Sequence, residues 1–220
     1  PEPSRLRALE RLLEEGRYDE LVRRLDVIVG QFPDHGGLRR LQVEALRKSG
    51  ATQAAALAAL HWSEHRPNSL PAQQSLLDLA VVSGKLLLAD RVAERVRSLG
   101  APTPGFPLDG ATVEGLSQQM DGSHAPRADM ERLEIGRLFL DGFDFAEAVR
   151  RLDGLEQAPA RNNRALALFH LHDVDAALTA FDGVRRDDPA NLFALGWCVR
   201  LRLFGGDRER ALEEARQLGS

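Results

Sequence analysis

The chain has 220 residues, of which 43% are hydrophobic and 28% are charged, and its net charge is −4. This composition excludes a disordered tail and suits one elongated or two compact globular domains. No strongly basic segment is present, so we expect no nucleic-acid binding. The longest apolar runs fall short of the roughly 20 residues that cross a bilayer, so we expect no membrane segment.

The redox chemistry of the chain is limited by a single cysteine. Cys198 cannot form a disulfide within the chain, which favours a reducing compartment, by default the cytoplasm. Its place beside Trp197 in an apolar helical stretch favours buried packing over a nucleophile. Because the first residue is proline, we expect a processed or shortened chain, from which a signal peptide or further repeats would be missing.

Three glycines mark a period in the first half. Gly16, Gly50 and Gly84 are 34 residues apart, and each separates two stretches with the apolar spacing of a helix. Small or apolar residues follow five positions after each glycine, and prolines follow seventeen positions after two of them: Leu21, Ala55, Ala89, Pro33 and Pro67. A proline ends the second helix, since it cannot continue it. The period therefore predicts three helical hairpins, over residues 2–34, 35–68 and 69–101.

The same pattern returns after residue 128. Ala148, Ala177 and Ala211 match the small position, and Pro189 matches the terminating proline. The step from Ala177 to Ala211 is again 34 residues, whereas the step from Ala148 to Ala177 is 29, which predicts trimmed turns between the fourth and fifth hairpins. We therefore expect three more hairpins, over residues 129–158, 159–190 and 191–220.

A segment rich in proline and glycine lies between the halves. Residues 102–127 hold four prolines and four glycines, too many for a continuous hairpin. A short helix from Thr112 to about Met120 is expected within it. The segment is either a linker that runs over the surface or a segment that folds into the groove of one half. The predicted organisation is thus repeats 1–3 in 1–101, a linker in 102–127, and repeats 4–6 in 128–220.

This pattern resembles the tetratricopeptide repeat (TPR) family. The resemblance is carried by a glycine and an aromatic residue in the first turn, by small residues and a first-helix glycine, and by the terminating prolines: Gly16, Tyr18, Ala55, Ala89, Ala148, Ala177, Ala211, Gly136, Pro33, Pro67 and Pro189. It implies an all-α fold, an α-solenoid of antiparallel helix pairs in two three-repeat halves. The family is one of protein-binding modules, so the resemblance also implies a protein or peptide partner.

Catalytic and metal chemistry has little support in the sequence. His61 and His65 are four residues apart on an expected helix and could meet one metal ion, but no third ligand accompanies them, and we read them as surface histidines beside a packed Trp62. We find no nucleotide-binding, phosphate-binding or hydrolase motif. We expect no metal, no cofactor and no enzymatic activity.

The resemblance places a candidate groove on the first helix of each hairpin. In the second half this groove would present Arg137, Asn162, Asn163, Phe169, His170, Trp197 and Arg200. Asparagine pairs with a peptide backbone, arginine with a carboxylate, and tryptophan gives contact area. We take Arg137, Asn162, Asn163, Trp197 and Arg200 as the partner-binding candidates, with Trp197 either a groove or a core residue.

The first-half groove is the weaker candidate. It would present a set of mixed charge without an aromatic anchor: Leu6, Glu10, Arg40, Glu44, Arg47, Gln74 and Asp78. The lysine and asparagine pattern with which some TPR proteins clamp the C-terminus of heat-shock chaperones is matched by Asn163 alone, so no such clamp is expected.

The sequence favours a non-catalytic scaffold that binds a peptide or helix of a partner protein in its groove. The alternative is a peptide-sensing or regulatory module of a larger transcriptional or signalling protein, in which a ligand changes the curvature between the halves. The last helix carries apolar residues at helical spacing: Ala211, Leu212, Ala215 and Leu218. We expect this edge either to pack on another molecule, for example by self-association, or to be covered by residues missing from a shortened chain.

Overall fold

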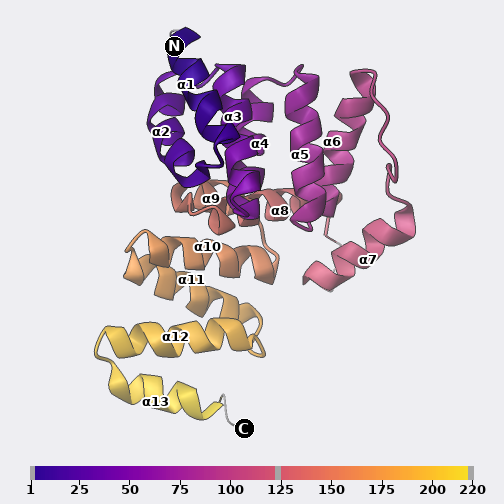
Figure 1. The fold of residues 1–220 in the computed structure, drawn as a ribbon. Helices are drawn as coiled ribbons and strands as arrows, with labels where there is room; N and C mark the ends of the chain where they lie inside the picture. The colour runs from indigo at the N-terminus through magenta and orange to yellow at the C-terminus, as the bar shows by residue number, and fades with distance from the viewer. Residues whose placement is uncertain (1–2, 122–124, 218–220) are drawn as a thin grey trace. The chain divides into compact units, whose positions relative to one another are not determined.

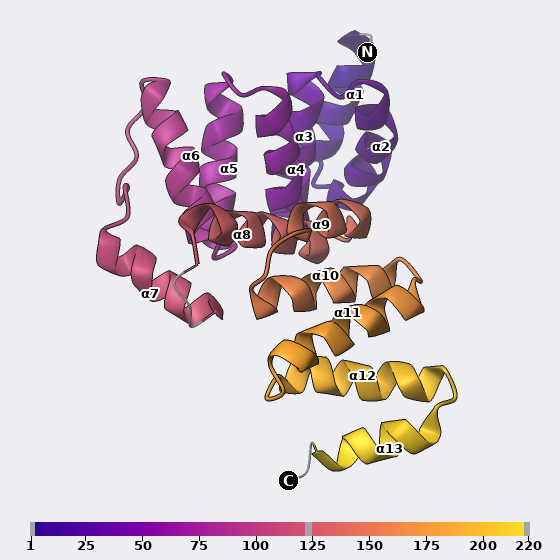
Figure 2. The ribbon, with the colours of Figure 1, turned by 180° about the vertical axis from the view of Figure 1, so that it is seen from behind.

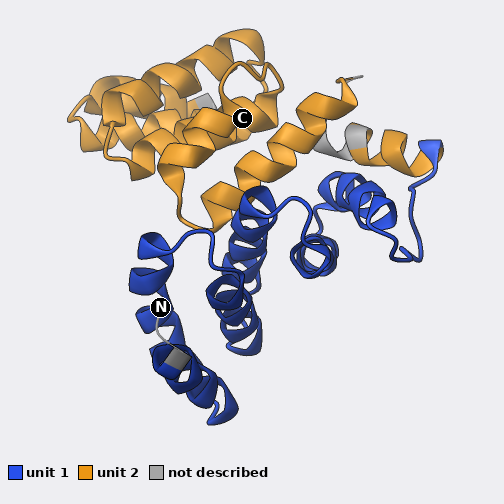
Figure 3. Ribbon diagram, turned by 90° about the horizontal axis from the view of Figure 1, so that it is seen from above, with its two compact units in different colours: residues 1–110 blue, residues 111–220 orange. Residues whose placement is uncertain are grey.

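The computed structural model describes residues 3–121 and 125–217, and within these residues it contains thirteen helices and no strand. The chain forms two compact units, residues 1–110 and 111–220, shown in two colours in Figure 3. None of the helices in the described residues has the length and apolar character needed to cross a bilayer. The predicted all-α class is confirmed.

Unit 1 consists of three helical hairpins that follow one another along the chain (Figure 1). Each helix packs against the next, so each hairpin also contacts its neighbour. The helices are α1 (Pro3–Glu14), α2 (Tyr18–Gln31), α3 (Gly36–Lys48), α4 (Thr52–His65), α5 (Leu70–Val82) and α6 (Leu86–Ser98). The three hairpins predicted from the glycine period are confirmed.

Unit 2 contains the other three hairpins, stacked as Figure 2 shows. Its helices are α7 (Gly110–Asp121), which begins at the boundary, α8 (Arg127–Asp141), α9 (Phe145–Leu152), α10 (Ala158–His170), α11 (Val174–Asp187), α12 (Leu192–Phe204) and α13 (Arg208–Gln217). The pairs α8 and α9, α10 and α11, and α12 and α13 are the predicted hairpins. Helix α7 confirms the short helix expected between Thr112 and Met120.

The periodic glycines form the turns inside the hairpins of unit 1. Gly16, Gly50 and Gly84 have φ values of 73°, 82° and 69°, in the left-handed region that glycine enters without steric cost. Each turn reverses the chain within three residues. The small residues that follow, Ala55 and Ala89, are fully buried, because two helix backbones approach each other closely there.

Gly136 has a different role, in the contact between α8 and α9. A Cβ atom at this position would lie 2.4 Å from one methyl carbon of Leu152 and 2.5 Å from its Cγ. Leu152 is fully buried and cannot move aside easily. Glycine is therefore required at 136 for this hairpin to close.

The 29-residue step in unit 2 has a different origin from the one expected. The connection between α9 and α10 is not trimmed; instead α9 has only 8 residues, against 14 in α2, α4 and α11. The backbone leaves the helix at Asp153, with ψ of 137°, and Gly154 then takes a φ of 72°. An aspartate and a glycine here favour a turn over another helical turn. The prediction of trimmed turns is wrong.

Part of the predicted linker is attached to unit 1. The backbone N–H of Leu108 donates to Oδ1 of Asp90 at 2.8 Å, and Nη1 of Arg97 donates to Oγ1 of Thr103 at 3.2 Å. Asp90 and Arg97 belong to α6, so these bonds hold the segment after α6 against that helix. The division into 1–101, 102–127 and 128–220 stays a prediction.

Buried ion pairs join the two helices of the last hairpin to each other and to α11. Arg202 of α12 donates from Nε to Glu214 of α13 at 3.0 Å and from Nη2 to both carboxylate oxygens of Asp182 in α11 at 2.8 Å. Arg185 of α11 also donates to Glu214, at 2.7 Å. The Arg202 and Glu214 side chains are 4% and 8% exposed. Burial lowers the pKa of Arg202, but the hydrogen bonds to the two carboxylates outweigh it and raise the pKa overall.

The residues expected to form an apolar edge on α13 differ in their exposure to solvent. Ala211 is fully buried and packs inward, while Leu212 is 60% exposed. Leu218 lies outside the described residues. Self-association through this edge stays a prediction, resting mainly on Leu212.

Candidate binding surface

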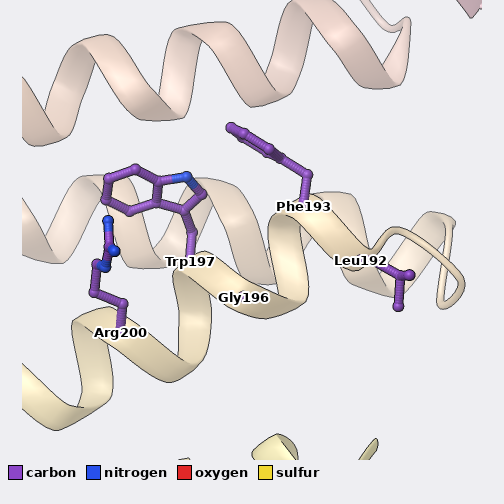
Figure 4. A pocket seen from close by; sticks show the side chains of 5 residues that line it. All are labelled: Leu192, Phe193, Gly196, Trp197 and Arg200. Atoms are coloured by element: carbon purple, nitrogen blue, oxygen red, sulfur yellow. The ribbon is translucent and has the colours of Figure 1, made fainter. Parts of the chain in front are cut away.

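A hollow of about 300 Å³ lies on α12, the first helix of the last hairpin (Figure 4). Residues on successive turns of one helix face line it: Leu192, Phe193, Gly196, Trp197 and Arg200. Two of the five, Trp197 and Arg200, are among the residues predicted from the repeat register. The hollow is the candidate binding surface of unit 2.

Trp197 belongs both to the hollow and to the core. Its ring stacks on Phe181, with centroids 5.8 Å apart and an angle of 6° between the planes, and Phe181 is fully buried. It also lies 5.0 Å from the ring of Phe169 in α10. The two interpretations of Trp197 are therefore compatible: one face of the indole packs on the core, and the residue also borders the hollow.

Arg200 lies across the indole of Trp197. Its guanidinium carbon is 4.9 Å from the ring centroid, a cation–π distance. Figure 4 shows the two side chains next to each other, one helical turn apart. This contact limits the rotamers of a side chain that is otherwise exposed.

Gly196 leaves the floor of the hollow open. It lies in the interior of α12, where glycine costs about 1 kcal/mol relative to alanine. No atom lies within 4 Å of the position that its Cβ would take, so packing does not require glycine here, in contrast to Gly136. What the glycine does provide is free space between Phe193 and Arg200.

Asn162 is the predicted residue whose placement differs most from the others. It is 8% exposed, and its Nδ2 donates to Oδ1 of Asn191 at 3.2 Å. The same oxygen of Asn191 accepts the backbone N–H of Ala194 and so caps α12. Asn162 thus joins two consecutive repeats through its amide nitrogen, whereas its side-chain oxygen is buried without a hydrogen-bond partner.

The remaining predicted residues lie on α8 and α10. Arg137 is exposed, with Nε 4.0 Å from Oδ2 of Asp141, and Asn163 is half-buried. The binding roles of Arg137, Asn162, Asn163, Trp197 and Arg200 stay predictions.

A row of aromatic rings connects three repeats of unit 2, and the sequence interpretation missed part of it. Phe145 of α9 stacks on His170 of α10 at 4.5 Å, His170 contacts Phe169 at 5.5 Å, and Phe169 contacts Trp197. Phe193, 47% exposed, ends the row 6.4 Å from Trp197. Phe145 and Phe193 were not among the candidates. The repeat register places Phe193 at a groove position, one turn before Trp197 on the same helix face, so the sequence could have suggested it.

The predicted groove of unit 1 also contains a hollow. About 280 Å³ lie between α3 and α5, bordered by Arg40, Val43, Glu44, Arg47, Ser75, Asp78 and Leu79, four of which were predicted. Two of its charged residues already have ionic partners: Arg40 lies 3.5 Å from Glu10 and 3.8 Å from Glu44, and Lys48 lies 3.8 Å from Glu44. These pairs would have to separate to bind a charged ligand.

The remaining chemical candidates have structural partners. His65 contacts Asp34 at 3.1 Å through Nδ1, and Trp62 is buried as expected. In residues 3–121 and 125–217 no three side chains of histidine, cysteine, aspartate or glutamate are close enough together to hold a metal ion. Cys198 is fully buried, as predicted, and burial together with Asp182 raises its thiol pKa to about 12.

Comparison with known proteins gives structural neighbours only. No family model and no curated protein matches the chain. The solved structure of YrrB, "a TPR protein with an unusual peptide-binding site", is 15% identical with a TM-score of 0.41, over 86% of this chain and 88% of that one. The TPR domain of P58(IPK) is 16% identical with a TM-score of 0.42, over 96% and 66%. The TPR2AB domain of yeast Sti1, in complex with pHSP90, is 15% identical with a TM-score of 0.38, over 94% and 84%.

The fold itself repeats the features that carried the resemblance. Antiparallel helix pairs follow one another, and the glycines, small residues and aromatic positions occupy the turns and contacts expected of them. Each unit has a TPR-like fold. Of the two hollows described above, the one on α12 is bordered mostly by apolar side chains, and the one between α3 and α5 mostly by polar and charged ones.

Proposed function

We propose that the chain is a non-catalytic scaffold that binds a segment of a partner protein in the groove of unit 2, at the hollow on α12. The observation that carries the proposal is Gly196, a helix-interior glycine beside open space. Gly196 lines the hollow, and a larger side chain there would narrow it, so glycine at this position supports a ligand in the hollow.

The side chains around the hollow indicate the chemistry of the ligand. Phe193 and Trp197 offer aromatic surface to an apolar side chain, and Arg200 offers two parallel N–H donors to a carboxylate. Asn163 and Arg137, on α10 and α8, would extend the contact to a peptide backbone and to a further acidic group. We therefore propose a ligand segment in which an apolar residue and an acidic residue are close neighbours.

The experiment selects peptides from a random library on the immobilised 220-residue chain and measures their dissociation constants by fluorescence polarisation. Gly196→Leu fills the hollow and should weaken binding by roughly tenfold or more, as loss of a central contact does. Arg200→Ala should weaken most the peptides that contain an acidic residue. Peptides that bind Gly196→Leu as tightly as the original chain would refute the site.

The matched control is Gly30→Leu. Gly30 also lies inside a helix, α2, with nothing within 4 Å of the place that a Cβ atom would take, but in unit 1 and away from the hollow. Both substitutions should keep the helical circular dichroism, and only Gly196→Leu should change affinity. Equal losses from both would mean that the effect comes from the fold and not from the hollow.

Three coarser points belong to the same proposal. We propose a cytoplasmic location, on the ground that Cys198 is a buried, unpaired thiol suited to a reducing compartment. We propose no nucleic-acid partner, since the net charge is −4. Self-association through Leu212 is a further proposal, tested below.

A further inference from the structure

The turns inside the six hairpins are equivalent, and two of them lack the glycine that the other four have at positive φ. Each turn has one residue with positive φ, five residues before the small or apolar residue that begins the contacts of the second helix. In four turns this residue is glycine, with φ between 69° and 83°: Gly16, Gly50, Gly84 and Gly206. In the other two it is Phe143, with φ of 65°, and His172, with φ of 64°.

Phe143 is the more unusual of the two. An L-residue with a bulky side chain is strained in this conformation, whereas glycine is not. Strain of this kind can be offset when the side chain packs in the core, but the Phe143 side chain is 79% exposed. The phenylalanine at this position therefore adds little to the stability of the folded unit, and four equivalent turns have glycine there instead. A contact outside the unit would explain it.

The two exceptional turns share one apolar surface. The ring of Phe143 lies edge-on to Phe145 at 6.1 Å, and Phe145 stacks on His170 of the next hairpin at 4.5 Å, with 11° between the planes. Leu171 follows His170 and is 43% exposed, and His172 is exposed beside it. We call Phe143, Phe145, His170, Leu171 and His172 the turn edge.

Carboxylates border the turn edge. Residues 138–149 and 165–184, which include both turns, contain no lysine and no arginine. Asp144 and Asp173 cap α9 and α11, each accepting one backbone N–H, and Asp175 lies in the first turn of α11.

Two other acidic groups near these turns have basic partners. Asp141 is 4.0 Å from Arg137, and Glu147 accepts hydrogen bonds from Arg150 and Arg151. The net charge beside the aromatic surface is thus negative, from Asp144, Asp173 and Asp175. This surface complements a cation that lies over a ring while carboxylates neutralise it.

We propose that the turn edge binds a segment of a partner protein in which arginine or lysine stands next to an apolar or aromatic residue. The cation meets the exposed ring of Phe143 and the carboxylates of Asp144 and Asp173, and the apolar residue covers Leu171. This surface is separate from the hollow on α12, whose Arg200 favours an acidic segment. The two surfaces select opposite charges.

The test measures two labelled peptides by fluorescence polarisation on Gly196→Leu, in which the α12 hollow that favours acidic segments is filled. One peptide repeats Arg-Gly-Phe-Gly, and the other repeats Glu-Gly-Phe-Gly. We expect the arginine peptide to bind about tenfold or more tightly than the glutamate peptide, with the advantage lost at high salt. Equal affinities would overturn the proposal, because the acidic border would then have no effect.

Phe143→Gly is the decisive variant, since it removes the ring and also relieves the backbone. Its melting temperature should not fall, while affinity for the arginine peptide should fall about tenfold. Val82→Ala, a similarly exposed apolar residue before the turn between α5 and α6, is the control and should bind as the original chain does. Unchanged binding in Phe143→Gly, or the same loss in Val82→Ala, would overturn the proposal. Gly196→Leu should not alter this binding, so failure here and failure of the α12 hollow are distinguishable.

Discussion

Removing the Glu214 carboxylate should release α13 from unit 2. In Glu214→Ala, Arg202 loses one of its two carboxylate partners and Arg185 loses the acceptor at 2.7 Å. Breaking a buried ion pair by removing one member costs about 3–5 kcal/mol. Because Arg202 keeps both bonds to Asp182, we expect the lower end, about 3 kcal/mol, which corresponds to roughly a hundredfold more frequent opening of the last hairpin.

Hydrogen exchange and urea unfolding would measure this effect together. Exchange should accelerate in α13 and at the end of α12, with less change in α8 and α9, because repeats contact mainly their neighbours. Glu213→Ala removes the same charge from an exposed neighbouring position and is the control, expected within about 0.5 kcal/mol of the original chain.

A double variant separates the ion pair from simple packing. Arg202→Met combined with Glu214→Leu leaves fewer buried charges without partners and should recover much of the stability lost in Glu214→Ala. If Glu214→Ala is no less stable than Glu213→Ala, the buried charges do not hold α13, and the reasoning is refuted.

Four further outcomes are expected. Gly136→Ala should destabilise unit 2 by about 1–3 kcal/mol in urea unfolding, whereas Gly30→Ala should not destabilise unit 1. Cys198 should resist alkylation at pH 8 in the folded chain and react once urea unfolds it, because its thiol pKa is raised to about 12; rapid labelling of the folded chain would contradict this. Hydrogen bonds from two arginines lower the pKa of Glu147 from 4.5 to about 2, so its contribution to stability is complete above pH 4.5 and is lost as the pH falls to 2; Glu147→Gln should flatten the acid unfolding curve in that window. Sedimentation at rising concentration should show self-association that Leu212→Glu reduces, and a monomer unaffected by this change would remove the C-terminal edge as an interface.

The repeat architecture could be predicted from the sequence because its signals are local and periodic. Glycines at 34-residue steps occupy left-handed turns, and small residues follow them where helices approach. The residue types of Gly16 and Ala55 therefore indicate their structural roles directly. The short α9 was harder to place, since Ala148 and Ala177 give the total step but not whether helix or turn is lost.

The candidate site was less accessible to sequence reasoning. Trp197 and Arg200 were found because the repeat register places them on the first helix, but the same register also selected Asn162, whose burial depends on Asn191 of the next repeat. The register aligns Phe143 with Gly16, five residues before the small position, but only the backbone shows that Phe143 also takes a positive φ.

The buried charges are a second case in which sequence reasoning falls short. Arg202 and Glu214 look like residues of a solvated helix face, because a charged residue is buried only when its partners come from other helices. Asp182 is twenty residues before Arg202. Such long-range partners have no signature in the period of the repeat.

The equal turns of unit 1 make its length adjustable in whole steps. Gly16, Gly50 and Gly84 have nearly the same φ at intervals of 34 residues, and the caps that begin α3 and α5, His35 and Ser69, are also 34 apart. Loss or duplication of residues 35–68 therefore joins helices through a turn of a type already present, so evolution or an engineer can change the number of hairpins there without designing a new connection. Unit 2 is less regular, because its first step, from Ala148 to Ala177, is 29 residues, while its second, from Ala177 to Ala211, is 34.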